Sequence, residues 1–206
     1  MSSEVKVLVL YYSMFGNIAE MTKAVAEGVN SVPGAAAVVK QVPDLLPDKV
    51  INENAAIKAV KDRYRDVPVA AVNDLAEADA VIVGTPTRFG NMCAQMRNFW
   101  DQTGGLWGKG ALIGKPAGVY TSTASPHGGQ ETTIISTMFT LMHHGMIIVG
   151  VPYSVEELVT TTGGGTPYGP SHTAGPEADI PVDEKEKVIC RALGRRVAEV
   201  AIKLKG

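Results

Sequence analysis

The feature that most constrains this chain is a run rich in apolar residues at 6–12, followed by the short segment Ser-Met-Phe-Gly-Asn at 13–17. A run of this length, rich in valine, leucine and tyrosine, predicts a buried strand. From Ile18 onward the apolar residues Met21, Val25 and Val29 recur at helical spacing. The chain therefore opens with a strand, a tight loop and a helix, the unit from which parallel α/β folds are built.

This opening loop is a candidate anion site. The unpaired amides of the first helical turn point into it, and the helix dipole favours negative charge there. Ser13 adds a hydroxyl donor, Gly16 permits close backbone approach, and Asn17 is predicted to cap the helix. The loop has no lysine and lacks the G-x-x-x-x-G-K-[ST] pattern of nucleotide triphosphate sites. We expect a neutral cradle for one terminal phosphate, such as that of flavin mononucleotide (FMN); the alternative is an ordinary strand-to-helix turn.

Length and composition favour a single globular domain covering residues 1–206. Of these residues, 45% are hydrophobic and 19% charged, and the formal net charge is −2. This near-neutral charge gives no reason to expect a nucleic-acid partner. No run of apolar residues predicts membrane insertion or an export signal. The two cysteines and four histidines show neither a disulfide framework nor metal-ligand spacing, so no metal is expected. The expected compartment is cytoplasmic.

Strands and helices alternate along the rest of the chain. Strands are predicted at 6–12, 36–42, 79–84, 116–121 and 146–151. Helices are predicted at 18–32, near 55–63, briefly from 73, and at 92–104, 131–144 and 183–205, whereas 163–181 is predicted to be a long loop or arm. This order predicts an α/β fold, a doubly wound five-stranded parallel sheet with helices on both faces.

Three unusual loops follow three of these strands, at 13–18, 85–91 and 122–129. Right-handed crossovers bring the carboxyl ends of parallel strands to one edge of the sheet. Ligands of such folds bind there, where the strand order reverses. The three loops are therefore predicted to form one ligand site.

Several motifs, taken in order, resemble the WrbA family of flavodoxin-like NAD(P)H:quinone oxidoreductases, first described as Trp-repressor-binding proteins. They are Ser-Met-Phe-Gly at 13–16, Gly-Thr-Pro-Thr-Arg-Phe-Gly-Asn-Met at 84–92, Asp-Gln-Thr-Gly-Gly-Leu-Trp at 101–107, Gly-Gly-Gln-Glu at 128–131, His-His-Gly at 143–145 and Gly-Gly-Thr-Pro-Tyr-Gly at 164–169. The resemblance implies a flavodoxin-like fold, an FMN cofactor and two-electron reduction of quinones by NADH or NADPH. It also implies a homotetramer.

The resemblance implies specific site residues. Those placed against FMN are Ser13, Met14, Phe15, Gly16, Asn17, Ile18, Thr87, Arg88, Phe89, Gly90, Asn91, Ser122, Thr123, Ala124, Ser125, His127, Gly128 and His143. Phe15 and Trp107 are expected to bind substrate, although the family usually has tyrosine where Phe15 stands. His143 is the candidate catalytic residue, through a hydrogen bond or a proton to the quinone oxygen.

Each of these roles has a plainer alternative. Arg88, expected to favour the reduced flavin through its charge, is otherwise a surface arginine in a salt bridge. His143 is otherwise a helix C-terminal residue that caps carbonyls, and His127 a surface histidine. His144 is expected to be structural. Trp107 lies in a glycine-rich segment rather than on a periodic face, which favours a pocket over the core.

Three function classes remain open from the residues. The first is a quinone oxidoreductase in which nicotinamide and quinone bind in turn, a ping-pong cycle. The second is a flavodoxin-type electron carrier, which would need a strongly acidic face that this near-neutral chain lacks. The third is a non-catalytic regulatory binding protein, for which no basic patch or partner helix is visible.

Overall fold

The computed structural model describes residues 4–205 and contains a central parallel sheet. Its strands are β1 (Val5–Tyr11), β2 (Ala35–Gln41), β3 (Ala80–Arg88), β4 (Asn91–Met92), β5 (Pro116–Thr123), β6 (Ile147–Ile148) and β7 (Ser171–Thr173). The main order is β2-β1-β3-β5-β6, with β7 also paired to β5 and β4 antiparallel to β3. The order reverses between β1 and β3, as a doubly wound fold requires, so the predicted fold class is confirmed.

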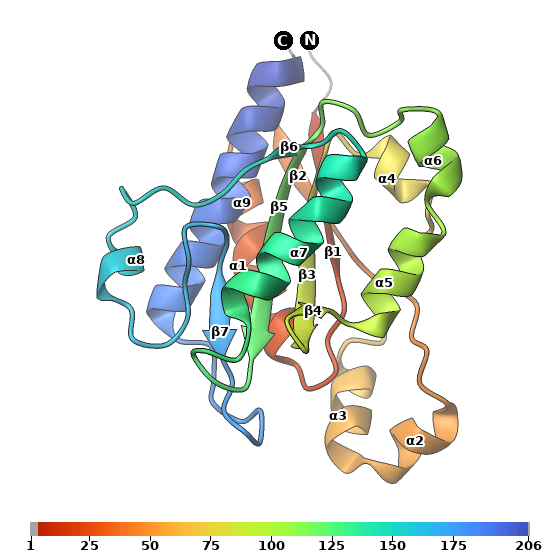
Figure 1. The fold of residues 1–206 in the computed structure, drawn as a ribbon, viewed down its shortest axis with the longest axis vertical. Helices are drawn as coiled ribbons and strands as arrows, with labels where there is room; N and C mark the ends of the chain where they lie inside the picture. The colour runs from red at the N-terminus through yellow and green to blue at the C-terminus, as the bar shows by residue number, and fades with distance from the viewer. Residues whose placement is uncertain (1–3, 206) are drawn as a thin grey trace.

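Helices cover both faces of the sheet. They are α1 (Asn17–Asn30), α2 (Asp48–Glu53), α3 (Ala55–Arg63), α4 (Asp74–Glu77), α5 (Ala94–Asp101), α6 (Gly104–Gly108), α7 (Gln130–His143), α8 (Glu157–Thr160) and α9 (Glu184–Lys205). Figure 1 shows α1 and α9 on one side of the sheet, α5 and α7 on the other, and the pair α2–α3 below the sheet. Among the described residues, no helix has the length and apolar character needed to cross a membrane.

The strands are apolar on both faces because each face packs against helices. In β1, Val7 and Val9 join the core under α1 and α9, whereas Leu8 and Leu10 join the core under α5 and α7. All four side chains are fully buried. This explains why residues 7–12 form a continuous apolar run rather than an alternating pattern.

Helices α1 and α9 pack with their backbones in close contact at two glycines. A Cβ atom on Gly194 would lie 2.1 Å from the carbonyl oxygen of Val25, and one on Gly28 would lie 2.1 Å from that of Arg191. Only glycine fits at such a distance. The contact fixes α1, and with it the loop that precedes α1, against the sheet.

The predicted fifth strand, 146–151, and the predicted loop, 163–181, are partly wrong. Only Ile147–Ile148 pairs with β5 as a strand. The chain then leaves the sheet, and Val151 N donates to the Pro167 carbonyl instead. The second half of β5 pairs instead with β7, which lies inside the predicted loop. A three-residue polar strand, Ser-His-Thr, has no apolar pattern that would predict it.

Other boundaries also differ from the predictions. β3 continues through Arg88 and forms a hairpin with β4, in the region predicted to be a loop at 85–91. The glycine-rich segment around Trp107 forms the short helix α6. The predicted helix near 55–63 is confirmed as α3, whereas α2 and α8 were not predicted.

Candidate functional site

The carboxyl ends of β1, β3 and β5 surround a cavity of about 230 Å³. Each of the three predicted loops contributes to it. The predicted residues that line it are Ser13, Met14, Phe15, Asn17, Ile18, Thr87, Arg88, Ser122, Thr123 and Ala124. The structure therefore brings together, at one edge of the sheet, ten residues that lie up to about half the chain apart.

The turn between β1 and α1 presents free amide groups. The first intrahelical bond joins Glu20 N to Gly16 O at 3.0 Å, so the amides of residues 17–19 have no partner within the helix. Gly16 caps the helix at φ 96°, a left-handed conformation that favours glycine. The prediction that Asn17 caps the helix is wrong: its side-chain amide donates instead to the Ala178 carbonyl at 3.1 Å.

Ser13 completes this turn. Its hydroxyl oxygen accepts a hydrogen bond from Gly16 N at 3.1 Å. Because a hydroxyl both donates and accepts, its own proton stays available to a ligand oxygen. The turn thus offers several neutral donors to an anion at the positive end of α1.

The turn is braced from outside by charged groups that neutralise one another. Lys61, on α3, pairs with Asp44, lies 4.4 Å from the centre of the Tyr12 ring and donates to the Ser13 carbonyl at 3.3 Å. Burial raises the pKa of the Asp44 carboxyl, but hydrogen bonds, first of all from Lys61, bring it below its usual value. Burial and Asp44 together raise the pKa of the Tyr12 hydroxyl. The loop itself stays neutral.

Arg88 lies exposed at the rim of the cavity. Its guanidinium donates to the Thr87 carbonyl at 2.7 Å and lies 3.5 Å from the Met14 sulfur. None of the ion pairs within residues 4–205 involves Arg88. Its predicted alternative, a surface arginine in a salt bridge, therefore finds no support in this part of the chain.

Other predicted residues lie outside this cavity. They are Gly16, Phe89, Gly90, Asn91, Ser125, His127, Gly128, His143 and Trp107. Phe89 is fully exposed at the tip of the β3–β4 hairpin, with φ 53°. His127 is exposed on the loop between β5 and α7. Gly16 shapes the turn between β1 and α1 through its backbone rather than by lining the cavity.

A second, open cavity of about 530 Å³ holds Asn91, Trp107 and His143. His143 ends α7, a helix of 14 residues, so it lies about 20 Å from the end of α7 that follows the β5 loop. His144, beside it, is buried and its Nε2 lies 2.9 Å from the Thr103 hydroxyl. Burial, and then the neighbouring His143, lower the pKa of His144. This environment agrees with a structural role for His144.

The sequence did not indicate five further residues that line the first cavity. They are Pro86, Ala174, Gly175, Pro176 and Ala178. Four of them follow β7, in the segment predicted to be a loop or arm. The Gly175-Pro176 pair is a turn signal, but nothing in the sequence shows what the turn packs against.

The first cavity fits FMN. A phosphate group needs donors, and the turn supplies free helix amides and the Ser13 hydroxyl without a competing carboxylate. A flat ring needs apolar contact, and Met14, Phe15 and Pro86 line the same cavity. Thr87 and Arg88 add polar groups at the rim.

Comparison with known proteins agrees with this geometry. The family described as NADPH-dependent FMN reductase matches residues 5–158. A relative from Geobacter sulfurreducens is 50% identical over 202 residues, which cover 97% of this chain and 99% of the relative. One from Chromohalobacter salexigens is 52% identical over 207 residues, with coverages of 98% and 99%. Both relatives are named NAD(P)H dehydrogenase (quinone).

Solved structures show the same fold at lower identity. A WrbA-like flavodoxin from Agrobacterium tumefaciens is 24% identical, with a TM-score of 0.61 and coverages of 97% and 99%. Oxidised flavodoxin 1 from Bacillus cereus is 16% identical, with a TM-score of 0.58 and coverages of 94% and 97%. From the family match and the close relatives together, the chain belongs to the NADPH-dependent FMN reductase family, in the branch of flavodoxin-like NAD(P)H:quinone oxidoreductases that its motifs resemble.

Proposed function

We propose that this chain is an FMN-dependent NAD(P)H:quinone oxidoreductase that reduces quinones by two electrons in a ping-pong cycle. The observation that carries the proposal is the neutral, amide-rich turn between β1 and α1, opening on a cavity with apolar walls. FMN, when bound, accepts a hydride from NADH or NADPH and delivers two electrons to the quinone. The names of the relatives support both substrates.

The residues of the first cavity divide into two groups. We assign the phosphate of FMN to the turn at 13–18, called the phosphate turn from here on, and to Ser122 and Thr123 at the end of β5. We assign the flavin ring to the apolar walls near Phe15 and to Thr87 and Arg88. The exposed Arg88 guanidinium favours a negatively charged reduced ring by its charge.

We further propose a homotetramer in which a second copy completes the site. Within one copy, the length of α7 keeps His143 away from the first cavity. Large apolar side chains are exposed around the second cavity: Trp107 is 61% exposed and Phe139 55%. Such a patch on a soluble surface marks an interface. A neighbouring copy would supply Trp107 and His143 to the quinone, with His143 as the candidate proton donor.

We also propose one domain over residues 1–206 and a cytoplasmic location. Both cysteines, Cys93 and Cys190, are free and buried, which suits a reducing compartment. We expect no nucleic-acid partner at the near-neutral net charge.

The test is the visible spectrum of the purified protein, followed by steady-state assays. The proposal expects a yellow protein, or one that becomes yellow with FMN, that NADH or NADPH bleaches anaerobically and that a quinone reoxidises over many turnovers. A yellow protein that nicotinamide does not bleach would instead indicate an electron carrier. A protein that stays colourless when mixed with FMN would refute the proposal.

A further inference from the structure

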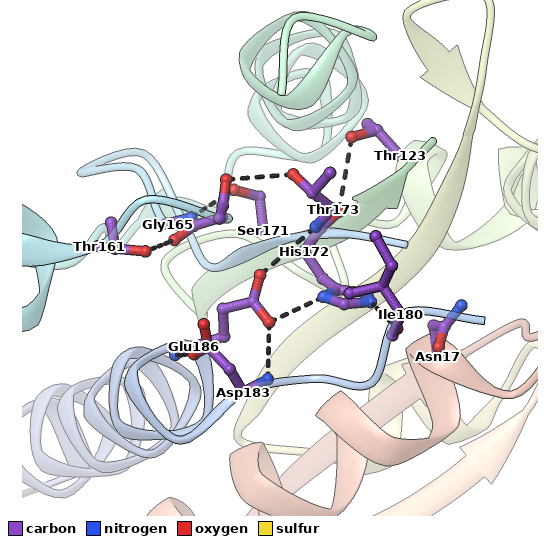
Figure 2. A network of polar contacts seen from close by, with 12 residues as sticks. Asn17, Thr123, Thr161, Gly165, Ser171, His172, Thr173, Ile180, Asp183 and Glu186 are labelled. Carbon is purple, nitrogen blue, oxygen red and sulfur yellow. Dashed lines mark hydrogen bonds and ion pairs between the residues drawn. The ribbon is translucent and has the colours of Figure 1, made fainter. Parts of the chain in front are cut away.

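A buried histidine–glutamate pair lies next to the chain segment that forms one wall of the first cavity. His172, on β7, and Glu186, near the start of α9, are 1% and 2% exposed, and their Nδ1 and Oε2 atoms lie 2.8 Å apart. The other ring nitrogen of His172, Nε2, lies 3.0 Å from the Ile180 carbonyl oxygen. Figure 2 shows the imidazole held between Glu186 and Ile180.

Both ring nitrogens face atoms that accept hydrogen bonds. A backbone carbonyl can only accept, so Nε2 carries a proton. Glu186 also accepts from the backbone N–H groups of Asp183 at 2.9 Å and Thr173 at 3.4 Å. His172 therefore bridges the Glu186 carboxyl group and the Ile180 carbonyl through its two ring nitrogens.

The residues that follow β7 form a strap, defined here as residues 174–180. Its members Ala174, Gly175, Pro176 and Ala178 line the first cavity. Ala178 has φ 58°, a conformation that alanine disfavours. The strap therefore keeps its shape through contacts rather than through local preference.

Few contacts hold the strap, and two of them come from side chains. At one end, Ala174 N donates to Thr123 O at 2.8 Å. The Asn17 side chain, on α1, donates to the Ala178 carbonyl, and His172 donates to the Ile180 carbonyl. Asn17 belongs to the phosphate turn, so the strap joins that turn to the His172–Glu186 pair.

We propose that His172 is a positioning residue for the FMN site: held in place by Glu186, it fixes the strap against the phosphate turn. This inference rests on the proposed function, because it assumes that FMN occupies the first cavity. If the strap is already ordered before FMN binds, binding costs less conformational entropy and is therefore tighter. His172 itself does not line the cavity and acts through the strap.

The test uses the full-length variant His172→Gln, whose shorter side chain cannot bridge Glu186 and the Ile180 carbonyl as the imidazole does. Loss of this buried hydrogen bond predicts that the FMN dissociation constant rises about tenfold. Amide exchange at Ala178 and Ile180, whose N–H groups bond within the strap, should also become about tenfold faster. His144→Gln, another buried histidine replaced in the same way, should change neither value.

The Glu186→Gln variant and the double variant show whether the pair acts as one unit. The double variant should weaken FMN binding no more than either single change does, because removing one partner already breaks the pair. Additive effects of the two single changes would overturn the pairing.

The outcomes separate this inference from the proposed function. If the wild-type protein binds no FMN, the proposed function fails, while the exchange of the strap amides still tests His172. Unchanged exchange and an unchanged FMN dissociation constant in His172→Gln would overturn the inference. If that variant does not fold, amide exchange at Ala178 and Ile180 in Glu186→Gln decides, and exchange unchanged from the wild type would overturn the inference.

Discussion

The indole Nε1 of Trp107 donates a hydrogen bond to the backbone carbonyl oxygen of His143 at 2.9 Å. This bond ties α6 to the C-terminal end of α7, and both residues line the second cavity. Two residues expected to meet the substrate thus form one unit, away from the phosphate turn of the same copy.

Replacing Trp107 with alanine should raise the quinone KM about tenfold, because an aromatic wall for the flat quinone is lost. FMN binding should stay unchanged, since Trp107 lies outside the first cavity. Trp107→Phe keeps a ring but loses the bond to His143, so its KM should rise less. Steady-state kinetics on FMN-loaded protein measure both, and a wild-type KM in Trp107→Ala would exclude this role.

Replacing Arg88 with alanine should lower the reduction potential of bound FMN by about 30 mV, equivalent to ~1.4 kcal/mol for two electrons. The reason is the loss of a positive charge beside the reduced ring. Arg88→Lys keeps the charge and serves as the control. Anaerobic titration against a reference dye gives the potential. Equal potentials in the wild type and Arg88→Ala would remove the electrostatic role.

Replacing Gly16 with alanine should destabilise the apoprotein by about 1 kcal/mol, because φ 96° disfavours a side chain. It should also weaken FMN binding by distorting the phosphate turn. Gly34→Ala is a matched control, since Gly34 has φ 84° and no atom within 4 Å of an added Cβ. Urea unfolding should show similar losses in both variants. FMN titration should separate them, and equal affinities would argue against a phosphate site at Gly16.

Acid should remove the stabilisation that Asp44 provides. Burial raises its pKa, but bonds from Lys61, Leu46 N and Tyr12 lower it below the usual 3.8 in the folded protein. A lowered pKa stabilises the fold above the unfolded-state value, and this contribution is lost as the pH falls through the folded-state value. The difference in unfolding free energy between the wild type and Asp44→Asn should therefore be largest near neutral pH.

That difference should close as the pH falls below the unfolded-state pKa of about 4 and through the lower folded-state pKa. Asp66→Asn is the control, because the Asp66 side chain is 95% exposed and its substitution should have little effect at any pH. Urea unfolding at several pH values measures both variants. A gap that persists undiminished at the lowest pH would contradict the ionic role of Asp44.

Replacing Gly194 with alanine should cost about 3 kcal/mol or more, because its Cβ would overlap the Val25 carbonyl and force α1 away from α9. Gly104→Ala, in α6, meets no atom within 4 Å and should be neutral. Thermal unfolding of the two variants gives the comparison. A small loss in Gly194→Ala would show that the helices separate easily.

The sequence by itself determined the α/β class, the positions of the main strands along the chain and the turn between the first strand and the first helix. These follow from local patterns: the apolar run before Ser13, the helical spacing after Ile18, and the loops at the ends of three strands. Patterns of this kind are visible because burial on both faces of a sheet, or on one face of a helix, repeats along the chain.

Only the tertiary structure decided which residues close the cavity and which do not reach it. β7 is three residues long and polar, so its pairing with β5, and the wall formed by residues 174–180, left no periodic signal. His143 and Trp107 belong to motifs that are visible in the sequence, yet both line the second cavity. His143 stands at the far end of α7, and Trp107 is bonded to its carbonyl. Contacts between segments far apart in the chain depend on packing in three dimensions, and no local pattern records that packing.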